Sequence, residues 1–338
     1  MELSSAHADW SLETATAYFH ATVVPALHRE QHIGAQVSAP ELVHFTARSA
    51  VFRHTVADRP LAVKIGGPGS VRHHSAAAAF DWLKLLSRHR STGGKLSSPN
   101  AVAHLPEVSA LVTEWIDAPT VKRVLHTECR SIGLAAIGAA TRWLRCFHKL
   151  HHPVSRPFRA RGKLVAAEKA FETNAAYLPE ADEPVARYAM ARLSEFAEQL
   201  QERPTDYRVL HHDASSANFF FNGERAIGFD LHDRRRGDPL LDYSRLLIDA
   251  HLQLPLLIDE TAPYGIDDGL FRVMLENADV DAIADLPERL RIHLLSASLT
   301  RYARQLTLTG QVAQERRLRL LTAAQTLARD DVPPPLPV

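Results

Sequence analysis

The pattern of apolar residues changes near Ala118-Pro119, and this change constrains the fold more than any other feature of the sequence. Upstream, short apolar runs bounded by turn residues such as Asp58-Arg59-Pro60 predict strands. The predicted strands cover residues 42–45, 50–56, 61–65 and 111–116. Apolar residues at helical spacing predict helices over 11–30 and 73–88. The first 117 residues are therefore expected to form an antiparallel sheet with one or two helices.

Downstream of the change, the apolar spacing is mainly helical. The predicted helices lie within 132–151, within 164–202 with breaks at Pro179 and Pro184, and within 239–328. A chain of 338 residues is long enough for two lobes with a sizeable buried core. We therefore expect an α+β fold with an N-terminal lobe over 1–117, a helical C-terminal lobe over 118–330 and a disordered proline-rich tail over 331–338.

Composition excludes several classes of protein. Lys and Arg together number 39, as do Asp and Glu, so the chain as a whole is no polyanion binder and we expect no nucleic acid partner. Two cysteines cannot form a disulfide framework in a chain of this length, which favours a reducing compartment. The sequence shows no secretory signal at its start and no run of 18 apolar residues. We therefore expect a cytoplasmic protein without membrane insertion.

One predicted hairpin in the helical lobe gathers polar side chains. Its strands are expected at Tyr207–Leu210, Asn218–Phe221 and Arg225–Phe229. Asn222-Gly223 predicts a two-residue turn between the last two strands. In that register Asp230 lies just past the end of the ladder, beside the loop that holds Asp213. We therefore expect turn geometry to bring Asp213, Asn218 and Asp230 together.

Two carboxylates and an amide around one loop permit more than one kind of chemistry. Mg²⁺ takes oxygen ligands and is usually held by one or two carboxylates together with substrate phosphates. Alternatively, Asp213 can accept a proton from an attacking hydroxyl while Asn218 and Asp230 ligate the metal. Each of the three residues could also serve only to cap a turn or a helix.

Three runs of the sequence follow one another in this part of the chain, His211–Asn218 (HHDASSAN), Ile227–Asp230 (IGFD) and Gly237–Tyr243 (GDPLLDY). Together they resemble the signature motifs of the aminoglycoside phosphotransferase-like kinases, which are small-molecule relatives of the protein kinases. The resemblance implies a two-lobed, protein-kinase-like fold. It also implies transfer of the γ-phosphoryl group of ATP or GTP to a hydroxyl of a small molecule with Mg²⁺, with Asp213 as base and Asn218 and Asp230 as metal ligands.

Upstream motifs extend the resemblance over residues 40–250. The run Leu61-Ala62-Val63-Lys64 is similar to the strand whose lysine contacts the ATP phosphates, which implies that role for Lys64. A run of four residues, Thr113, Glu114, Trp115 and Ile116, resembles the family's hinge segment, against which adenine lies. Residues 46–52 take the place of the nucleotide-covering loop without any glycine, and Ser49 is their candidate phosphate contact.

Two departures from the family pattern bear on the expected activity. The alignment of the first-lobe helix puts Ala76 where a glutamate normally pairs with the lysine. Asp81 lies five residues further on and should point about 140° away, so Lys64 is expected to lack its usual partner. His212 replaces the glycine before Asp213. A nucleotide-binding pseudokinase that acts as an interaction module is therefore an alternative to an active kinase.

The charge of the acceptor stays open. Nine acids against one base over residues 259–288 would suit a cationic acceptor such as an aminoglycoside. In the opposite sense, Arg234-Arg235-Arg236 would favour an anionic acceptor such as a phosphorylated sugar. Either run could instead be a solvated surface. The expected acceptor is an aminoglycoside-like antibiotic or a saccharide, and the alternatives are metabolites such as choline, homoserine or a sugar of the cell envelope.

Two other chemistries have weaker support. His148 and His151 have the spacing of a metal-ligand pair, but no paired Cys or Glu accompanies them, which disfavours a structural zinc site. Ser215 and Ser216 lie near His and Asp residues, but the chain lacks a Gly-x-Ser-x-Gly elbow. Nucleophilic hydrolysis is therefore disfavoured as well.

Overall fold

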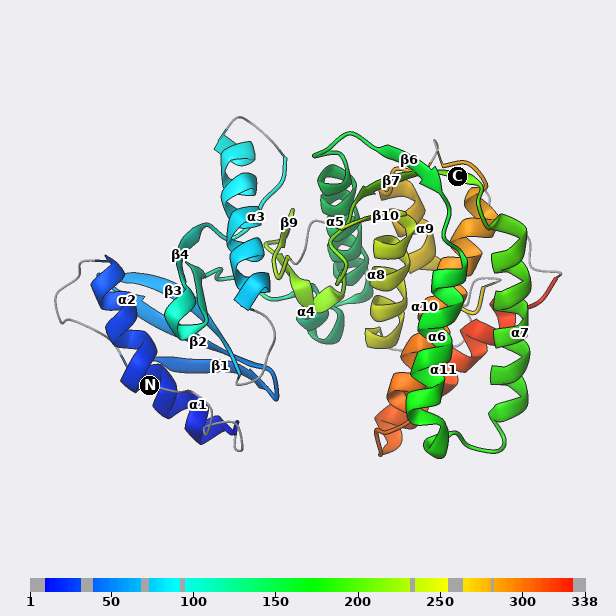
Figure 1. Ribbon diagram of the computed structural model, residues 1–338, viewed down its shortest axis with the longest axis horizontal. Coiled ribbons are helices and arrows are strands. Elements are labelled where there is room, and N and C mark those ends of the chain that lie inside the picture. Colours follow the sequence, from blue (N-terminus) through cyan, green and yellow to red (C-terminus); the bar gives the residue numbers. More distant parts are fainter. Residues whose placement is uncertain are drawn as a thin grey trace. The chain divides into compact units, whose positions relative to one another are not determined.

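The computed structural model describes residues 10–31, 39–67, 73–91, 95–231, 235–254, 264–280 and 283–330. The chain divides into two compact units, which Figure 1 shows as ribbons. The first comprises Met1–Ala118 and Ile227–Arg234, and the second comprises Pro119–Ala226 and Arg235–Val338. The first contains an antiparallel sheet and the second is mainly helical, so the predicted α+β class is confirmed. The predicted tail over 331–338 lies outside the described residues.

One segment groups differently from the sequence-based division, which assigns every residue from 118 to 330 to the C-terminal lobe. Residues Ile227–Arg234 belong to the first unit. Within that unit, the amide of Gly228 donates a hydrogen bond to the carbonyl of Ser97 at 3.1 Å, and Asp230 pairs with Lys64. Contacts between residues far apart in the sequence therefore decide where this segment belongs.

The first unit contains a five-stranded antiparallel sheet in the order β1-β2-β3-β5-β4. Its strands are β1 (Glu41–Thr46), β2 (Ser49–Val56), β3 (Arg59–Gly66), β4 (Ala101–Leu105) and β5 (Ala110–Glu114). Four of them confirm predicted strands. The strand β4 is not predicted, because Ala101 and Ala103 have low strand propensity and give a weak signal.

The turn between β2 and β3 lies one residue earlier than predicted. Ala57 and Asp58 occupy it with φ angles of 47° and 61°, whereas Arg59 and Pro60 belong to β3. A tight turn with two positive φ angles matches the right-handed twist of the flanking strands. The carbonyl of Pro60 accepts a hydrogen bond from the amide of Trp115 at 3.1 Å, so the proline belongs to the paired strand rather than to the turn.

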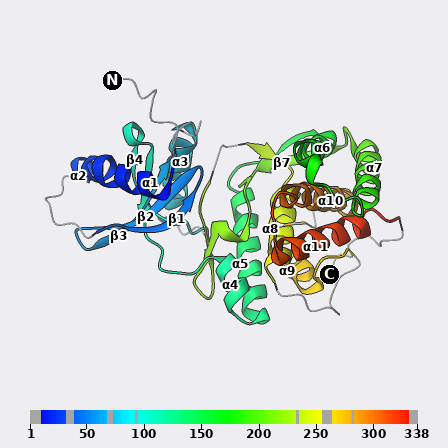
Figure 2. The same ribbon diagram turned by 90° about the horizontal axis from the view of Figure 1, so that it is seen from below.

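The predicted helix over 11–30 is confirmed, but it contains one turn of π-helix. Its parts are α1 (Leu12–Tyr18), η1 (Phe19–Val23) and α2 (Val24–Gln31). Pro25 has no N–H to donate to an earlier carbonyl, which accounts for the altered pattern just before it. Figure 2 shows α1 and α2 along one face of the sheet. The side chains that this helix buries in the core are Ala15, Phe19, Val23, Ala26 and Leu27.

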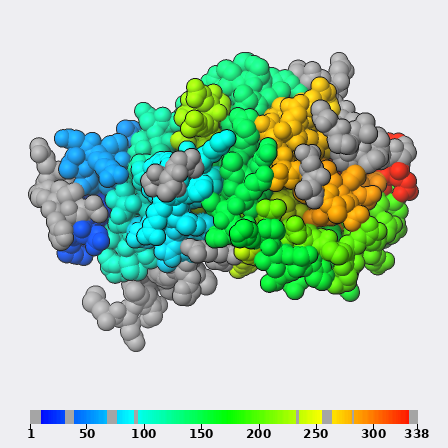
Figure 3. All heavy atoms as spheres, turned by 90° about the horizontal axis from the view of Figure 1, so that it is seen from above, coloured from blue at the N-terminus to red at the C-terminus, as the bar shows by residue number. Residues whose placement is uncertain are grey.

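The second predicted helix of this unit is α3 (His73–Ser91), which packs against β4. It buries Trp82, Leu83 and Leu86, whereas Asp81 is exposed. In the space-filling view of Figure 3 the residues of α3, coloured cyan, form part of the surface of the first unit.

Helices make up most of the second unit. They are α4 (Val121–Thr127), α5 (Arg130–His148), α6 (Arg161–Asn174), α7 (Glu183–Leu200), α8 (Leu240–Gln253), α9 (Asp268–Asn277), α10 (Leu286–Gln305) and α11 (Gln311–Leu327). The helices α6, α7 and α11 all contact α10 (Figure 1). Pro184 stands in the first turn of α7, and residues 175–182 separate it from α6, so the predicted break is confirmed.

Short strands position the motifs of the predicted hairpin. One sheet consists of β6 (Val154–Pro157), β7 (Pro204–Val209) and β10 (Arg236–Gly237), in the order β10-β7-β6. A second, two-stranded sheet consists of β8 (Phe219–Phe221) and β9 (Ala226–Gly228). The strand β7 leads directly into the loop His211–Asn218, and β10 leads into α8. The two motifs therefore begin at the ends of neighbouring strands.

The connection from β8 to β9 is longer than predicted. Four residues link the strands, and the Oδ1 atom of Asn222 accepts hydrogen bonds from the amides of Glu224 and Arg225 at 3.2 and 2.9 Å. Of Asn222 and Gly223, only the glycine has a positive φ, 97°. The predicted two-residue turn is therefore wrong, because the asparagine side chain caps a wider loop.

Candidate active site

One face of the sheet carries three of the predicted nucleotide-binding residues. In the antiparallel register Ser49, Lys64 and Thr113 lie opposite Gly66, Val51 and Ala62, respectively. Opposed residues and residues two apart share a face of a sheet, so the side chains of Ser49, Lys64 and Thr113 all lie on one face. These side chains are half-buried, whereas the opposite face is fully buried in the core.

Lys64 forms an ion pair with Asp230 inside the first unit. The ammonium Nζ of Lys64 lies 2.5 Å from Oδ1 of Asp230, and the two side chains are 34% and 24% exposed. Asp230 has a φ of 58°, a left-handed conformation that costs a non-glycine residue about 1–2 kcal/mol. The backbone conformation at Asp230 therefore costs free energy of folding. Both charged groups are accessible to a ligand, because each side chain is partly exposed.

The expectation that Lys64 lacks a partner is wrong. Asp230 supplies the carboxylate, and it lies 166 positions along the chain from Lys64. Ala76 stands on α3 without an acidic group, and the exposed Asp81 forms no ion pair among the described residues. The main reason for the pseudokinase alternative is thereby removed, because Lys64 has a carboxylate partner that comes from another part of the unit.

The predicted hinge, Thr113–Ile116, covers the end of β5 and the residues that follow it. The carboxylate of Glu114 accepts a hydrogen bond from Nδ2 of Asn100 at 2.6 Å. The guanidinium of Arg53 lies over the ring of Trp115, 5.0 Å from its centroid. The side chains of Glu114 and Trp115 are thus engaged within the unit, and a contact of the hinge with adenine stays a prediction.

Ser49 begins β2 directly after the turn that takes the place of a glycine-rich loop. The Oγ1 atom of Thr46 accepts hydrogen bonds from the amides of Arg48 and Ser49 at 3.2 and 3.0 Å. A threonine side chain therefore shapes this turn in place of glycine. The contact of Ser49 with a phosphate stays a prediction.

In the second unit, Asp213 and Asn218 lie side by side on the loop after β7. The Nδ2 atom of Asn218 donates hydrogen bonds to the carbonyl of Asp213 at 2.7 Å and to its carboxylate Oδ2 at 3.0 Å. Asn218 is buried, so this orientation is fixed. Since the amide nitrogen is used as donor, the Oδ1 atom of Asn218 is left as an oxygen ligand. The third residue of the predicted group, Asp230, belongs to the first unit with Lys64.

Three side chains of α8 hold this loop. Asp242 accepts hydrogen bonds from the amides of residues 211 and 212 at 2.7 and 3.0 Å. Arg245 donates a hydrogen bond to the carbonyl of the second of these residues. Asp249 accepts from the amide and the hydroxyl of Ser216 at 2.7 and 2.5 Å. Positions i, i+3 and i+7 share one helix face, so a single face of α8 orients the loop.

Arg245 and Asp249 belong to none of the motifs predicted from the sequence. Their signal is their spacing from Asp242 on a helix whose other residues are mostly apolar and buried. A charged group on a buried helix needs a hydrogen-bonding partner. Charges repeated at helical spacing inside such a helix therefore indicate a buried polar contact, although they do not name the partner.

Asp242 is the central buried charge of this support. Its Oδ2 lies 3.0 Å from Nε2 of His148, and its side chain is fully buried. Burial acts to raise the pKa of such a carboxyl group, but the hydrogen bond and charge of His148 and the amide of His211 outweigh burial and lower the pKa of Asp242 to about 2. The loop is therefore fixed by an ionised carboxylate.

The histidine that replaces the family's glycine adopts a conformation typical of glycine. His212 has a φ of 66°, where a Cβ atom costs energy that glycine avoids. Its Nε2 atom lies 3.2 Å from the carbonyl oxygen of Arg235. Burial is the main cause that lowers the pKa of His212, and nearby arginines, Arg245 and Arg235, add to it. The side chain therefore anchors the loop to the residue before β10.

The Gly-Asp-Pro motif before α8 has a packing role and an electrostatic role. A Cβ atom at Gly237 would lie 2.7 Å from Cδ1 of Leu210, so any other residue here would displace the Leu210 side chain. Asp238 is buried and accepts from Arg289 and His293, with Nη2 of Arg289 at 2.7 Å and Nε2 of His293 at 2.9 Å. Burial acts to raise the pKa of Asp238, but these two partners hold it well below its usual range.

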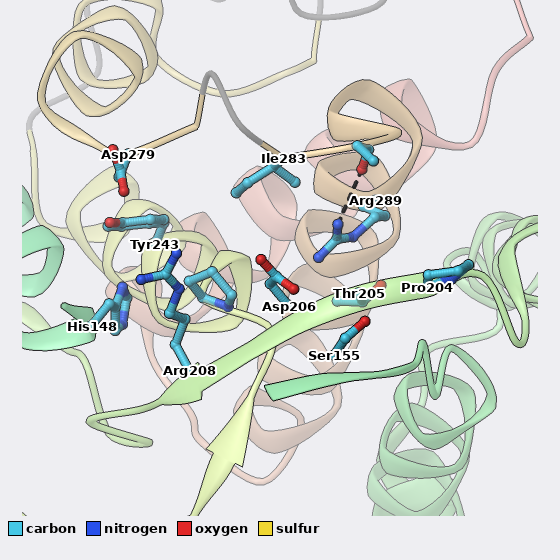
Figure 4. Close-up of a pocket in the computed structure, with 12 residues that line it drawn as sticks. His148, Ser155, Pro204, Thr205, Asp206, Arg208, Tyr243, Asp279, Ile283 and Arg289 are labelled. Carbon is cyan, nitrogen blue, oxygen red and sulfur yellow. Dashed lines mark hydrogen bonds between the residues drawn. The ribbon is translucent and has the colours of Figure 1, made fainter. Parts of the chain in front are cut away.

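A cavity of about 240 Å³ lies in the second unit beside this support. Figure 4 shows His148 and Tyr243 at one side of the cavity, with Arg208 next to them and Arg289 at the other side. No residue predicted for catalysis, nucleotide binding or metal binding lines it. The cavity is therefore separate from the predicted site residues.

The side chains available for a metal are oxygen donors. The described part of the chain contains no cluster of three or more His, Cys, Asp or Glu side chains that could hold a metal ion, and His148 is bonded to Asp242 instead. The Oδ1 atom of Asn218 and the carboxylate of Asp230 are the kinds of ligand that suit Mg²⁺. In the same described residues, no helix combines the length and the apolar character that a membrane span needs.

A comparison with protein families decides the assignment. The model of the phosphotransferase enzyme family (APH) matches residues 44–274, a stretch that contains Lys64, Asp213, Asn218 and Asp230. The chain belongs to this family. As a member of the phosphotransferase enzyme family, it is a small-molecule kinase. No curated protein sequence matches the chain significantly.

Solved structures share the fold over nearly the whole chain. A choline/ethanolamine kinase family protein from Mesorhizobium loti is 20% identical, with a TM-score of 0.58, and the match covers 94% of this chain and 97% of that one. A thermostable mutant of aminoglycoside phosphotransferase APH(4)-Ia, in a ternary complex with AMP-PNP and hygromycin B, is 13% identical, with a TM-score of 0.59 and coverage of 89% and 97%. The streptomycin-ATP-APH(2")-IIa ternary complex is 14% identical, with a TM-score of 0.55 and coverage of 91% and 98%.

Proposed function

We propose that this chain transfers the γ-phosphoryl group of ATP or GTP to a hydroxyl of a small molecule in a reaction that depends on Mg²⁺. The observation that carries the proposal is the hydrogen-bonded pair Asp213–Asn218 on a loop that one face of α8 holds at three points. A carboxylate whose orientation is fixed in advance can accept or orient the proton of an incoming hydroxyl without a further entropy cost.

One bond forms and one bond breaks at the γ-phosphorus. The acceptor hydroxyl oxygen forms a bond to the γ-phosphorus, while the bond from that phosphorus to the β–γ bridging oxygen breaks and ADP or GDP leaves with the electron pair. Asp213 takes the hydroxyl proton. Asn218 and Asp230 would hold Mg²⁺, which when bound offsets the charge of the phosphates, and Lys64 contacts the α- and β-phosphates.

The nucleotide site that we propose follows the half-buried face of the sheet. Ser49, Lys64 and Thr113 share that face, and Thr113 is the first residue of the hinge proposed for adenine. Two structural neighbours were solved with ATP or AMP-PNP, which supports a nucleotide as co-substrate. We propose the cytoplasm as its location, because ATP and GTP are available there.

The acceptor that we favour is a saccharide. The acids over 259–288 would suit a cationic aminoglycoside, but several of the described ones already have basic partners. These pairs are Asp267 with Arg130, Asp268 with Arg272, Asp279 with Lys149, and Asp285 with Arg203. A paired carboxylate offers little charge to a cationic acceptor. Hygromycin B and streptomycin in neighbouring structures, and the choline/ethanolamine kinase relative, keep aminoglycosides and amino-alcohols as alternatives.

The test is acceptor-dependent formation of ADP or GDP with Mg²⁺. The acceptor panel contains neutral and charged saccharides, aminoglycosides, choline and homoserine. We expect turnover with at least one acceptor, its loss in Asp213→Ala, and its retention in Asp206→Ala, which removes an exposed carboxylate from β7 of the same unit. Turnover that survives in Asp213→Ala, or nucleotide binding without turnover on any acceptor, would contradict the proposal.

A further inference from the structure

A series of contacts joins α10 to the loop that carries Asp213 and Asn218. On α10, the Nη1 atom of Arg301 lies 2.7 Å from Oδ1 of Asp249, which belongs to α8. The other carboxylate oxygen of Asp249, Oδ2, accepts hydrogen bonds from the amide and the hydroxyl of Ser216. Asp249 therefore divides its two oxygens between a second helix and the loop.

Burial makes these contacts depend on one another. The side chain of Asp249 is 7% exposed, that of Arg301 is 30% exposed, and Ser216 is fully buried. Among the residues that the structure describes, Arg301 is the one cation that pairs with Asp249. An unpaired charge is costly to bury. Without Arg301, the carboxylate is therefore expected to turn toward solvent and to release Ser216.

Ser216 is the point at which α8 holds the second half of the loop. It begins the short 3₁₀ turn Ser216–Asn218. The Nδ2 atom of Asn218 donates to the carbonyl of Asp213 at 2.7 Å, so the turn closes back onto the proposed base. The loop contacts of Asp242 all lie before Asp213. Asp249 is therefore the side chain of α8 that secures the residues between the base and Asn218.

We infer that Arg301 is a positioning residue for the phosphoryl transfer: it holds Asp249, and through Ser216 it keeps the turn with Asn218 in place beside Asp213. The inference rests on the proposed function and adds a residue to the same site. Arg301 lies outside residues 44–274, the stretch that the family model matches. Because a fixed geometry acts mainly on the rate of transfer, release of the turn should lower kcat more than it changes substrate binding.

Hydrogen exchange followed by mass spectrometry tests the loop itself and needs no turnover. Arg301→Gln should speed the exchange of the amides over residues 214–218 by about 10-fold and leave those of β7 within about 2-fold. Arg304→Gln removes an exposed arginine from the same helix and should change neither. Unchanged exchange in the loop of Arg301→Gln would overturn the inference. Equally faster exchange throughout the second unit would also overturn it, because Arg301 would then stabilise the fold as a whole.

Steady-state kinetics tests the consequence for the reaction. Arg301→Gln should lower kcat by at least about 10-fold and leave the KM of the acceptor within about 2-fold. Arg301→Lys should keep kcat within about 3-fold of the wild type, because the contact uses one nitrogen and an ammonium retains the charge. A wild-type kcat in Arg301→Gln, or a rate no higher with lysine than with glutamine, would overturn the inference.

A paired replacement keeps the test decisive if Arg301→Gln does not fold. The double variant Asp249→Leu, Arg301→Leu removes both charges, and apolar replacement of both members of a buried ion pair is often tolerated. It should fold, and it should show the faster loop exchange and the lower kcat of Arg301→Gln. A folded double variant with wild-type exchange and kcat would overturn the inference. Failure of both variants to fold would also overturn it, because the pair would then serve the fold rather than the loop.

The same measurements separate this inference from the proposed function. A loop that is loosened in Arg301→Gln, together with a wild type that turns over no acceptor, would sustain the support of the loop and contradict the kinase reaction. Turnover by the wild type that is unchanged in Arg301→Gln would sustain the kinase reaction and overturn the role of Arg301.

Discussion

The two groups of predicted catalytic residues are held in different ways. Lys64 and Asp230 form an ion pair, and a quarter to a third of each side chain is exposed. Asp213 stands on a loop whose backbone is bound at several atoms by α8, with Asp242 and Asp249 both buried. A partly exposed ion pair contributes little to stability, whereas a buried hydrogen-bonded carboxylate is costly to remove.

The difference indicates a division of tasks. The loop with Asp213 is preorganised, which suits a group that must meet a hydroxyl in one orientation. The accessible pair in the first unit can exchange its mutual contact for phosphates and a metal, which suits groups that bind a charged ligand. A variant that changes either the loop of Asp213 or the pair Lys64–Asp230 tests this division.

The largest effect is expected at the preorganised base. Asp213→Ala should lower kcat by about 10²-fold or more and leave nucleotide affinity within about 3-fold, because a positioned base acts mainly in the transition state. Steady-state kinetics and calorimetric binding of ATP measure the two quantities. An unchanged kcat would remove Asp213 from its role and make the fixed loop a structural feature only.

The next effect concerns the support of that loop. Asp242→Asn should destabilise the second unit by about 3–5 kcal/mol, because it leaves loop amides and His148 without their ionised acceptor. Chemical denaturation measures the loss. Asp206→Asn, which changes an exposed carboxylate of the same unit, is the matched control and should stay within about 0.5 kcal/mol.

The low pKa of Asp242 also predicts that the stability of the second unit depends on pH. Its folded-state pKa of about 2 lies below the ordinary value of 3.8, so its stabilisation is fully present above pH 4 and is lost as the pH falls through 2. The wild type should lose about 2 kcal/mol over this window through Asp242. Asp242→Asn should lack that part of the loss, and an identical pH slope in the variant would contradict the buried-charge account.

A smaller effect is expected at the accessible pair. Asp230→Asn should weaken binding of the Mg²⁺-nucleotide complex by about 10-fold and weaken binding of the metal-free nucleotide less, because the carboxylate charge offsets the ion. Titration of ATP with and without Mg²⁺ measures both affinities. Asp81→Asn on α3 is the control for an exposed acid of the same unit. Equal losses with and without metal would point to a fold defect and weaken the proposed division of tasks.

The smallest effect is expected on α3. Ala76→Glu should change nucleotide affinity by less than about 3-fold, because Lys64 already has Asp230 as partner and a further partly exposed ion pair is worth at most about 1 kcal/mol. Ala76→Gln controls for size without charge. A gain of about 10-fold that is specific to the glutamate would show that Asp230 does not by itself orient Lys64.

Local features of the chain were predictable because a short stretch of sequence encodes them. The stripe through Phe19 and Leu27 has the helical period, and the runs around Val51 and Val63 have the composition of strands. The pairing of Asp213 with Asn218 is equally local, since five positions separate them. Where the prediction of such a local feature was wrong, a side-chain hydrogen bond was the cause, such as the cap that Asn222 forms in the four-residue loop between β8 and β9.

The sequence alone determined the kind of fold, the order of the motifs and the chemistry of the loop, because periodicity and short-range spacing carry these properties. The tertiary structure decided which partner meets Lys64 and how α8 holds the loop that carries Asp213. Such contacts join residues far apart in the chain. They depend on how helices and strands pack, and no period or spacing along the sequence encodes that packing.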